Sequence, residues 1–206
     1  MERIRRIARA DRTRMSWANG LGVTEEIACG PAGSGGRPTW RLSVAELRVS
    51  APFSALAGID RVFTIIGESG VRLDFSGAAR DIEPLTPHAF PGEDAPGCTL
   101  TAPTEAFNVM AERGSVRAAV TPVEVAGATA INGTADTLLA VFVARGSGTL
   151  DGAPADTGDC LLIEPTAGSR VNPSGSHVNS APSHTFRGTA RLMVAELGPA
   201  AHEPGD

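Results

Sequence analysis

The sequence predicts an all-β protein built from two tandem antiparallel barrels with little helix. Three observations favour this class: frequent helix breakers, short runs of strand-forming residues and a faint internal repeat. Glycine (24 residues) and proline (15 residues) make up almost a fifth of the 206-residue chain and are spread along its length. Because both residues interrupt helices, we expect only short helices, near residues 51–59 or in the C-terminal tail.

Short strand-like runs fill the spaces between these breakers. They are rich in β-branched and aromatic residues and are bounded by turn-forming residues, which is typical of sandwiches and barrels. The runs are WRLSVAEL (40–47), RVFTIIG (61–67), GVRLDF (70–75), AFNVMAE (106–112), TLLAVFVA (137–144) and CLLIEP (160–165).

The internal repeat relates two of these regions. FTIIGESGVRL (63–73) and VFVARGSGTL (141–150) both read as an apolar strand, a Gly/Ser hairpin turn and a second strand. Each is followed by a strand that ends in proline, HAFPGE (88–93) and GDCLLIEP (158–165). This order resembles the cupin or jelly-roll-like barrel pattern. We therefore expect a bicupin, with an N-terminal barrel over residues 1–112 and a degenerate C-terminal barrel over residues 113–206.

Charge limits the class of partner. The formal net charge is −5, which argues against nucleic acid or an anionic membrane as the main partner. The chain has no lysine, and six of its arginines fall within MERIRRIARADRTR (1–14). This segment is either a phosphate-binding arm or an edge strand that charge protects from pairing, and the edge strand is favoured.

The three cysteines, Cys29, Cys98 and Cys160, are odd in number and far apart, and no CxxC occurs. Neither a disulfide framework nor a zinc knuckle is therefore expected. The N-terminus has no apolar stretch of the kind a secretory signal needs, and the longest apolar run is too short to span a bilayer. We expect a cytoplasmic protein.

The histidine pattern argues against a metal centre. Metal-dependent cupins place an HxH pair on one strand face, where alternate side chains point the same way. The four histidines, His88, His177, His184 and His202, form no such pair, and His177 and His184 lie in a polar run that reads as a loop. No GxSxG elbow, phosphate loop or dinucleotide fingerprint is present. We expect no metal and no cofactor.

Five ordered segments carry a family resemblance. They are WANGLGVTEEI (17–27), WRLSVAEL (40–47), PFSALAGIDRVFTIIGESGVRL (52–73), FPGE (90–93) and EAFNVMAERG (105–114). Together they resemble the signatures of the HutD/Ves family of cupin-like proteins, over roughly residues 15–114. The chain departs from the family pattern at Ala18, Leu21 and Glu105, and we expect the turn around Leu21 to survive because Gly20 and Gly22 remain.

The resemblance implies a role beside histidine utilisation, or a stress role like that of Ves. The family has no established catalytic activity, and its members are thought to modulate histidine breakdown by binding a pathway metabolite. The natural candidates, urocanate and the formyl- or formimino-glutamates, are small carboxylates. Because cupins dimerise readily, the resemblance also includes a homodimer among the expected assemblies.

Arg61 is the leading candidate for holding such a carboxylate, because a guanidinium offers a planar fork that binds it bidentately. The alternative is a surface ion pair with the adjacent Asp60. We expect Arg61→Ala to leave folding nearly intact, because loss of an arginine with an exposed head costs little.

Further candidate site residues follow from strand alternation. Arg41 and Ser43 share one face of their strand and look either into a polar lumen or into water. Asn108 shares a face with Met110 and needs hydrogen bonds if buried, from the backbone or from a ligand. Glu93 follows a strand end and is a general acid or, by preference, the partner of an arginine.

The first family-matched segment, WANGLGVTEEI (17–27), is called the opening motif here and contains the remaining candidate site residues. Trp17 walls a pocket or simply fills the core, and Asn19 belongs to a glycine-rich turn. Thr24 and Glu26 alternate in phase, so they return along a strand with both side chains on one face.

Three classes of function remain in play. A metal-free ligand-binding protein is favoured. A metal-free isomerase or hydrolase of a small carboxylated metabolite, with Glu93 or Glu26 as acid or base, is the alternative. A module that binds another protein is the third.

Overall fold

The computed structural model describes residues 3–17, 22–33, 35–134, 136–165 and 183–200. It contains strands and two 3-10 turns, η1 (Arg9–Asp11) and η2 (Gly92–Asp94), and no α-helix in these residues. The expected all-β class is confirmed. No helix in this part of the chain is long and apolar enough to cross a bilayer.

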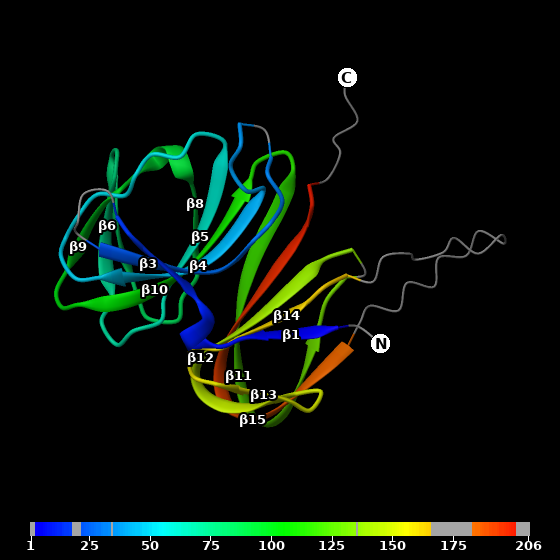
Figure 1. The fold of residues 1–206 in the computed structure, drawn as a ribbon. Helices are drawn as coiled ribbons and strands as arrows, with labels where there is room; N and C mark the ends of the chain where they lie inside the picture. Colours follow the sequence, from blue (N-terminus) through cyan, green and yellow to red (C-terminus); the bar gives the residue numbers. More distant parts are fainter. Residues whose placement is uncertain (1–2, 18–21, 34, 135, 166–182, 201–206) are drawn as a thin grey trace.

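The first half of the chain forms a six-stranded antiparallel sheet with a smaller sheet facing it (Figure 1). In spatial order the large sheet consists of β2 (Thr13–Ser16), β3 (Gly22–Cys29), β4 (Trp40–Leu47), β10 (Thr104–Glu112), β5 (Ile59–Ile65) and β8 (His88–Pro91). The small sheet consists of β7 (Ala78–Ile82), β6 (Val71–Phe75) and β9 (Gly97–Leu100). Phe63 and Ile65 of the large sheet pack against Val71 and Leu73 of the small one.

The second half forms another six-stranded sheet with its own core. Its path runs β1 (Ile4–Ile7), β14 (Cys160–Ile163), β12 (Leu138–Leu150), β15 (Ser183–Pro199) and β11 (Val116–Asn132), and β13 (Ala153–Asp156) also pairs with β12. The expected division after residue 112 coincides with the end of β10, directly before the turn to β11. The first strand, however, pairs with β14 of the second sheet, so residues 4–7 do not lie with the first barrel.

A shared core lies between the two large sheets. Phe107 of β10 stacks on Phe142 of β12, with ring centroids 4.7 Å apart. Leu138 and Phe142 of β12 face this core, whereas Leu139 and Val141 face the interior of the second sheet. Burial on both faces explains why this strand is continuously apolar instead of alternating.

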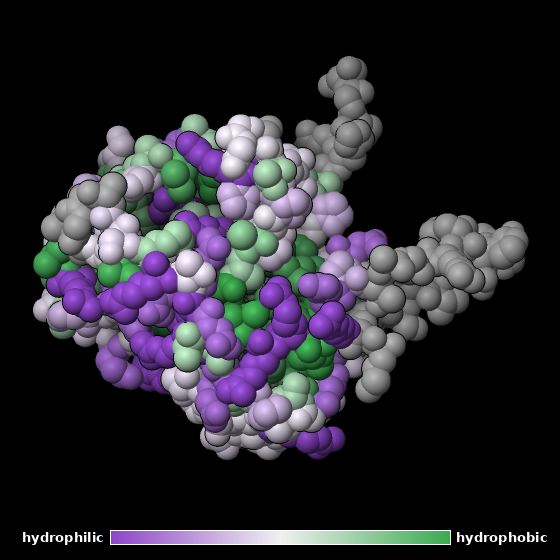
Figure 2. Space-filling view, in the orientation of Figure 1, coloured by the Kyte–Doolittle hydropathy of each residue, from purple (hydrophilic) through white to green (hydrophobic). Residues whose placement is uncertain are grey.

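Three of the N-terminal arginines, Arg5, Arg6 and Arg14, lie on edge strands, as the favoured interpretation predicted, because β1 and β2 end their respective sheets, whereas Arg9 lies in η1. The segment also crosses between the two halves. Arg12 donates to the Glu25 carboxylate of β3 and to the Gly158 carbonyl beside β14. Figure 2 shows a band of hydrophilic side chains across the front of the molecule, where this segment runs in Figure 1.

Three local predictions were wrong. The region 141–150 is not a hairpin but the end of one strand, with a bulge between Val143 and Arg145, and the turn follows at Asp151. A Cβ on Gly146 would meet the carbonyl of the neighbouring Thr189, so this glycine allows close approach of β15 and makes no turn.

The other two errors concern a loop and a helix. His184 lies in strand β15, where it is buried and 2.7 Å from the Asp151 carboxylate, and not in a loop. Residues 51–58 form no helix, because their backbone bonds instead to the segment 92–98, through Ala51, Phe53 and Leu56. The other expected helix, in the tail, and His177 lie outside the described residues.

Candidate ligand pocket

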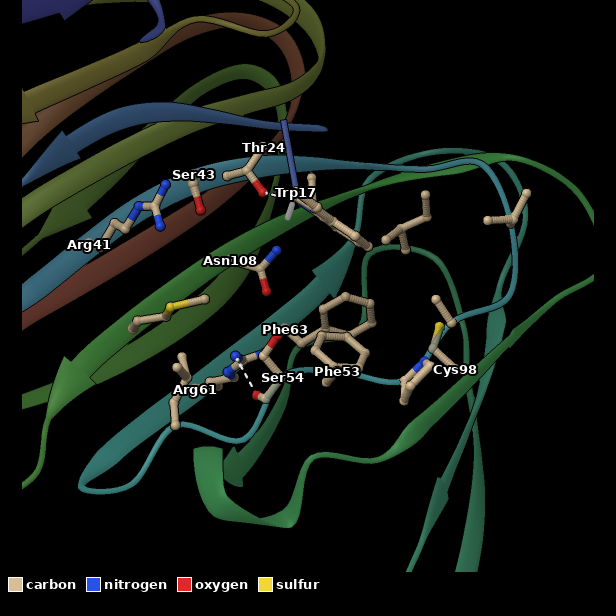
Figure 3. Close-up of a pocket in the computed structure, with 17 residues that line it drawn as sticks. Trp17, Thr24, Arg41, Ser43, Phe53, Ser54, Arg61, Phe63, Cys98 and Asn108 are labelled. Atoms are coloured by element: carbon tan, nitrogen blue, oxygen red, sulfur yellow. Dashed lines mark hydrogen bonds between the residues drawn. The ribbon is translucent and has the colours of Figure 1, made fainter. Parts of the chain in front are cut away.

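A pocket of about 380 Å³ opens inside the first barrel, between the large sheet and the segment that precedes β5 (Figure 3). This volume is within the range of small-molecule sites. Its lining consists of Trp17, Thr24, Arg41, Ser43, Ala45, Leu47, Val49, Ala51, Pro52, Phe53, Ser54, Leu56, Arg61, Phe63, Cys98, Asn108 and Met110.

Strand register brings the candidate residues together. Met110 on β10 pairs with Arg41 of β4 on one side and with Arg61 of β5 on the other. Asn108, two residues away on the same face, pairs with Ser43 of β4. The open question about the face of Arg41 and Ser43 is answered by their place in the lining, which is the lumen and not the outer surface.

Arg61 is buried, with only 5% of its surface exposed. Its Nη2 donates to the carbonyl of Ser54 at 3.1 Å, and its guanidinium lies 5.2 Å from the Phe53 ring centroid. Its Nε has no hydrogen-bond partner within the described part of the chain. Burial lowers the pKa of Arg61 to about 10, because the charged form loses its hydration. The premise of an exposed head was therefore wrong.

The nearby carboxylates are held elsewhere, outside the pocket lining. Arg113 lies 2.6 Å from the Asp60 carboxylate and 3.0 Å from that of Glu93. The bond from Arg113, helped by the Gly58 N–H, lowers the pKa of Glu93 to about 2. The preference for Glu93 as the partner of an arginine agrees with this geometry, but that arginine is Arg113. In the described part of the chain, no carboxylate forms an ion pair with Arg61.

Asn108 is the other buried polar group of the pocket, with 4% of its surface exposed. Its Nδ2 lies 3.5 Å from the Ala106 carbonyl, and its Oδ1 has no hydrogen-bond partner among the residues that the structure describes. A buried acceptor without a partner costs free energy, so this atom calls for an explanation.

The opening motif forms one wall of the pocket. Trp17 donates through Nε1 to the Thr24 hydroxyl at 2.8 Å and lies against Gly22, where a Cβ would come within 2.9 Å of the indole ring. The motif therefore requires a glycine at 22 because the ring occupies the space of a side chain. Asn19, with the departures at Ala18 and Leu21, lies outside the described residues.

Arg41 brings a second cation to the pocket, but one that is already neutralised. Its Nε lies 2.9 Å from the Glu26 carboxylate. Glu26 is thus beside the pocket, as its phase with Thr24 predicted, although it does not line the cavity itself. Of the two arginines that line the pocket, only Arg61 forms no ion pair with a carboxylate of the described residues.

The sequence reasoning missed the apolar and aromatic side of the pocket, chiefly Phe53, Ser54, Phe63 and Cys98. The sequence signal was present for three of them, because Phe53, Ser54 and Phe63 all lie in the longest family-matched segment, residues 52–73. Burial raises the pKa of Cys98 to about 11, so its thiol stays protonated.

The described residues contain no cluster of three or more His, Cys, Asp or Glu side chains that could hold a metal ion. His88 packs beside Phe75 and Phe90. His184 pairs with Asp151 in the second half of the chain. Neither lines the pocket.

The architecture is that of the bicupins, because solved proteins of this class share it at low sequence identity. Pirin YhhW from Escherichia coli, in complex with nickel(II), has a TM-score of 0.63 at 9% identity and is covered over its full length, with 96% of this chain aligned. At that identity the likeness concerns the fold alone.

The chain belongs to the HutD family, whose model matches residues 9–178. The structure of HutD from Pseudomonas fluorescens SBW25 (formate condition) has a TM-score of 0.82 and 30% identity, over 97% of this chain and 100% of that one. The conserved protein of unknown function PA5104 from Pseudomonas aeruginosa PAO1 has a TM-score of 0.78 and 28% identity over the same shares.

Curated relatives agree with this assignment. An uncharacterized 21.2 kDa protein in the hutC 3′ region of Pseudomonas putida is 36% identical over 101 residues, which is 48% of this chain and 53% of that protein. Protein Ves of Cronobacter sakazakii is 35% identical over 107 residues, which is 50% of this chain and 58% of Ves. The chain thus spans about half the length of the curated relatives it matches.

Proposed function

We propose that this protein binds a small carboxylated metabolite of histidine breakdown in the first-barrel pocket, without a metal, and thereby modulates that pathway. The candidate ligands are urocanate and the formyl- or formimino-glutamates. One observation carries the proposal: Arg61 is a buried cation that faces a ligand-sized cavity and has no carboxylate partner in the described residues.

Electrostatics favour an anion at this place. A buried charge without a partner is costly, and an anion that reaches it regains Coulomb energy in a low-dielectric site. Ser54 uses one N–H of the guanidinium and the Phe53 ring covers one side, so remaining N–H groups are available to a carboxylate. The planar fork suits a bidentate contact.

The assignment to histidine breakdown rests on the family of this chain and on one of its relatives. The chain belongs to the HutD family, and the relative from Pseudomonas putida is described by its place in the hutC 3′ region. Acid–base catalysis has less support, because neither candidate carboxylate is free in the pocket. Glu93 lies outside the pocket and forms an ion pair with Arg113, and Glu26 forms an ion pair with Arg41. Binding is therefore the function we favour over an enzymatic one.

Thermal unfolding and calorimetry test the proposal with trans-urocanate, N-formyl-L-glutamate and N-formimino-L-glutamate. A ligand at about one hundred times its Kd should add about 2.7 kcal/mol of apparent stability. The shift should be the same with and without EDTA. Arg61→Ala should weaken binding by about 2–5 kcal/mol, and Arg61→Lys should recover only part of this because ammonium lacks the fork.

Arg117→Ala is the matched control, because Arg117 is exposed on β11 outside the pocket and its loss should not affect binding. Unchanged affinity in Arg61→Ala would contradict the proposal. So would a shift that EDTA abolishes, because the site would then depend on a metal.

A further inference from the structure

Asn108 lies on the same sheet face as Arg61, close enough to contact a ligand that extends from Arg61 across the pocket. Met110 pairs with Arg61, so Asn108 is the diagonal neighbour of Arg61 across the β10–β5 ladder. Diagonal neighbours on one sheet face lie about 7–8 Å apart. In Figure 3 the amide of Asn108 stands between Ser43 and Arg61, with its oxygen on the Arg61 side. A ligand whose carboxylate meets Arg61 can therefore place its body beside this oxygen.

The orientation of the amide is set by its neighbour. The Ala106 carbonyl can only accept a hydrogen bond, so Nδ2, which lies 3.5 Å from it, must face it. The reversed amide would place two acceptors against each other. Oδ1 is thereby left as an acceptor in the pocket, buried and without a partner among the described residues.

We infer that Asn108 is a specificity-determining residue that accepts a hydrogen bond from an N–H group of the carboxylate ligand. This inference rests on the proposed function and narrows its substrate class. The ligand is a carboxylate that carries an N–H donor, such as an azole ring or a formamido group. Acids that present only acceptors at this point are disfavoured, because they leave Oδ1 unsatisfied or repel it.

Two flat acids of nearly equal shape test this. Both trans-urocanate and 3-(2-furyl)acrylate have an acrylate carboxylate on a five-membered ring, but only urocanate has an N–H. Calorimetry at about pH 8 keeps an imidazole mainly neutral. Wild type should bind urocanate about tenfold or more tightly, the effect of one buried hydrogen bond. In Asn108→Leu, which keeps the size of the side chain, this preference should disappear.

Thr64→Val is the matched control. Thr64 is also buried, and its hydroxyl has no hydrogen-bond partner in the described residues, but it does not line the pocket, so the preference should persist. Equal affinities in wild type would overturn the inference even if Asn108→Leu failed to fold, and so would a preference that survives in Asn108→Leu.

The same experiments distinguish a failure of the proposed function from a failure of the role inferred for Asn108. If both acids bind equally and lose affinity in Arg61→Ala, the carboxylate site stands and only the role of Asn108 is overturned. If neither acid binds but N-formyl-L-glutamate binds in a manner that depends on Arg61, the proposed function is supported, and the inference then requires Asn108→Leu to weaken this binding about tenfold; unchanged affinity in Asn108→Leu would overturn it. Absence of Arg61-dependent binding by every ligand would overturn both.

Discussion

At the residue scale, the pocket holds two polar side chains, Arg61 and Asn108, that are buried without a full set of partners. Such groups lower the stability of the empty protein, since they lose hydration without full replacement. A binding site tolerates this cost because the ligand restores the missing interactions. The exposed Arg113, in contrast, has two carboxylate partners.

Removal of the Arg61 charge should therefore stabilise the ligand-free protein. We expect Arg61→Met to raise the free energy of unfolding by about 1–3 kcal/mol, as a buried charge is replaced by an apolar chain of similar length. Arg113→Met is the control and should lower stability slightly, because it strands Asp60 and Glu93. Urea denaturation without ligand measures both. A marked loss of stability in Arg61→Met would mean that its contacts with Ser54 and Phe53 outweigh its desolvation.

At the element scale, the N-terminal segment joins the two halves. Its β1 strand completes the second sheet and its β2 strand completes the first. Asp159, directly before β14, accepts hydrogen bonds from Arg6 at 2.6 and 2.9 Å and from the Arg9 backbone at 3.2 Å. Arg9 also reaches the Glu105 carboxylate on β10 at 2.8 Å. The N-terminal segment thus forms hydrogen bonds and ion pairs with residues of both six-stranded sheets.

Because of Asp159, the contribution of these hydrogen bonds to the free energy of unfolding should decrease in acid. Burial raises the pKa of its carboxyl, but the N–H groups of Asp156, Arg6 and Arg9 outweigh burial and hold the pKa below 3.8. Because the folded pKa is depressed, the stabilisation is complete above the unfolded pKa and is lost as pH falls through the folded one. Asp159→Asn should cost about 1–3 kcal/mol at pH 7, and the difference from wild type should shrink below about pH 3.8.

Urea unfolding at several pH values measures this difference. Asp156→Asn is the control, because its side chain is exposed and lies 3.9 Å from Arg6, while its backbone N–H to Asp159 is retained. It should change stability little at any pH. Equal losses in the two variants would mean that Asp159 has no special part in holding the segment.

At the scale of the whole molecule, the two halves share a core and exchange a strand. Phe107 and Phe142 stack across the interface between the large sheets, and the cluster around them draws residues from both. Neither half can bury these surfaces alone. The molecule should therefore behave as one cooperative unit, even though its architecture repeats.

We expect a single thermal transition with equal calorimetric and van't Hoff enthalpies. Separate fragments 1–112 and 113–206 should not fold, since the first exposes Phe107 and the second lacks the β1 strand. Scanning calorimetry of the chain and circular dichroism of the fragments measure this. Two resolved transitions, or a fragment that unfolds cooperatively, would contradict a shared core.

Local patterns account for the predictions that were confirmed. Glycine and proline spacing excludes long helices, and alternation places Arg41 and Ser43 on one strand face. The ordered motifs identified the family and directed attention to Trp17, Arg61 and Asn108. Seven of the ten candidate site residues line one pocket: Trp17, Thr24, Arg41, Ser43, Arg61, Asn108 and Met110. Each of these lies on, or directly beside, a strand of the large sheet.

Other features depended on partners distant in the chain. The sequence by itself determined the all-β class and which side chains share a strand face, because these follow from local φ/ψ preferences and the two-residue period. Only the tertiary structure decided that β1 joins the second sheet, that Glu93 meets Arg113 and that the segment with Phe53 closes the pocket. Such pairings depend on how segments distant in the chain align with one another. That alignment is selected by the packing of the cores, and the local two-residue period of a strand does not encode it.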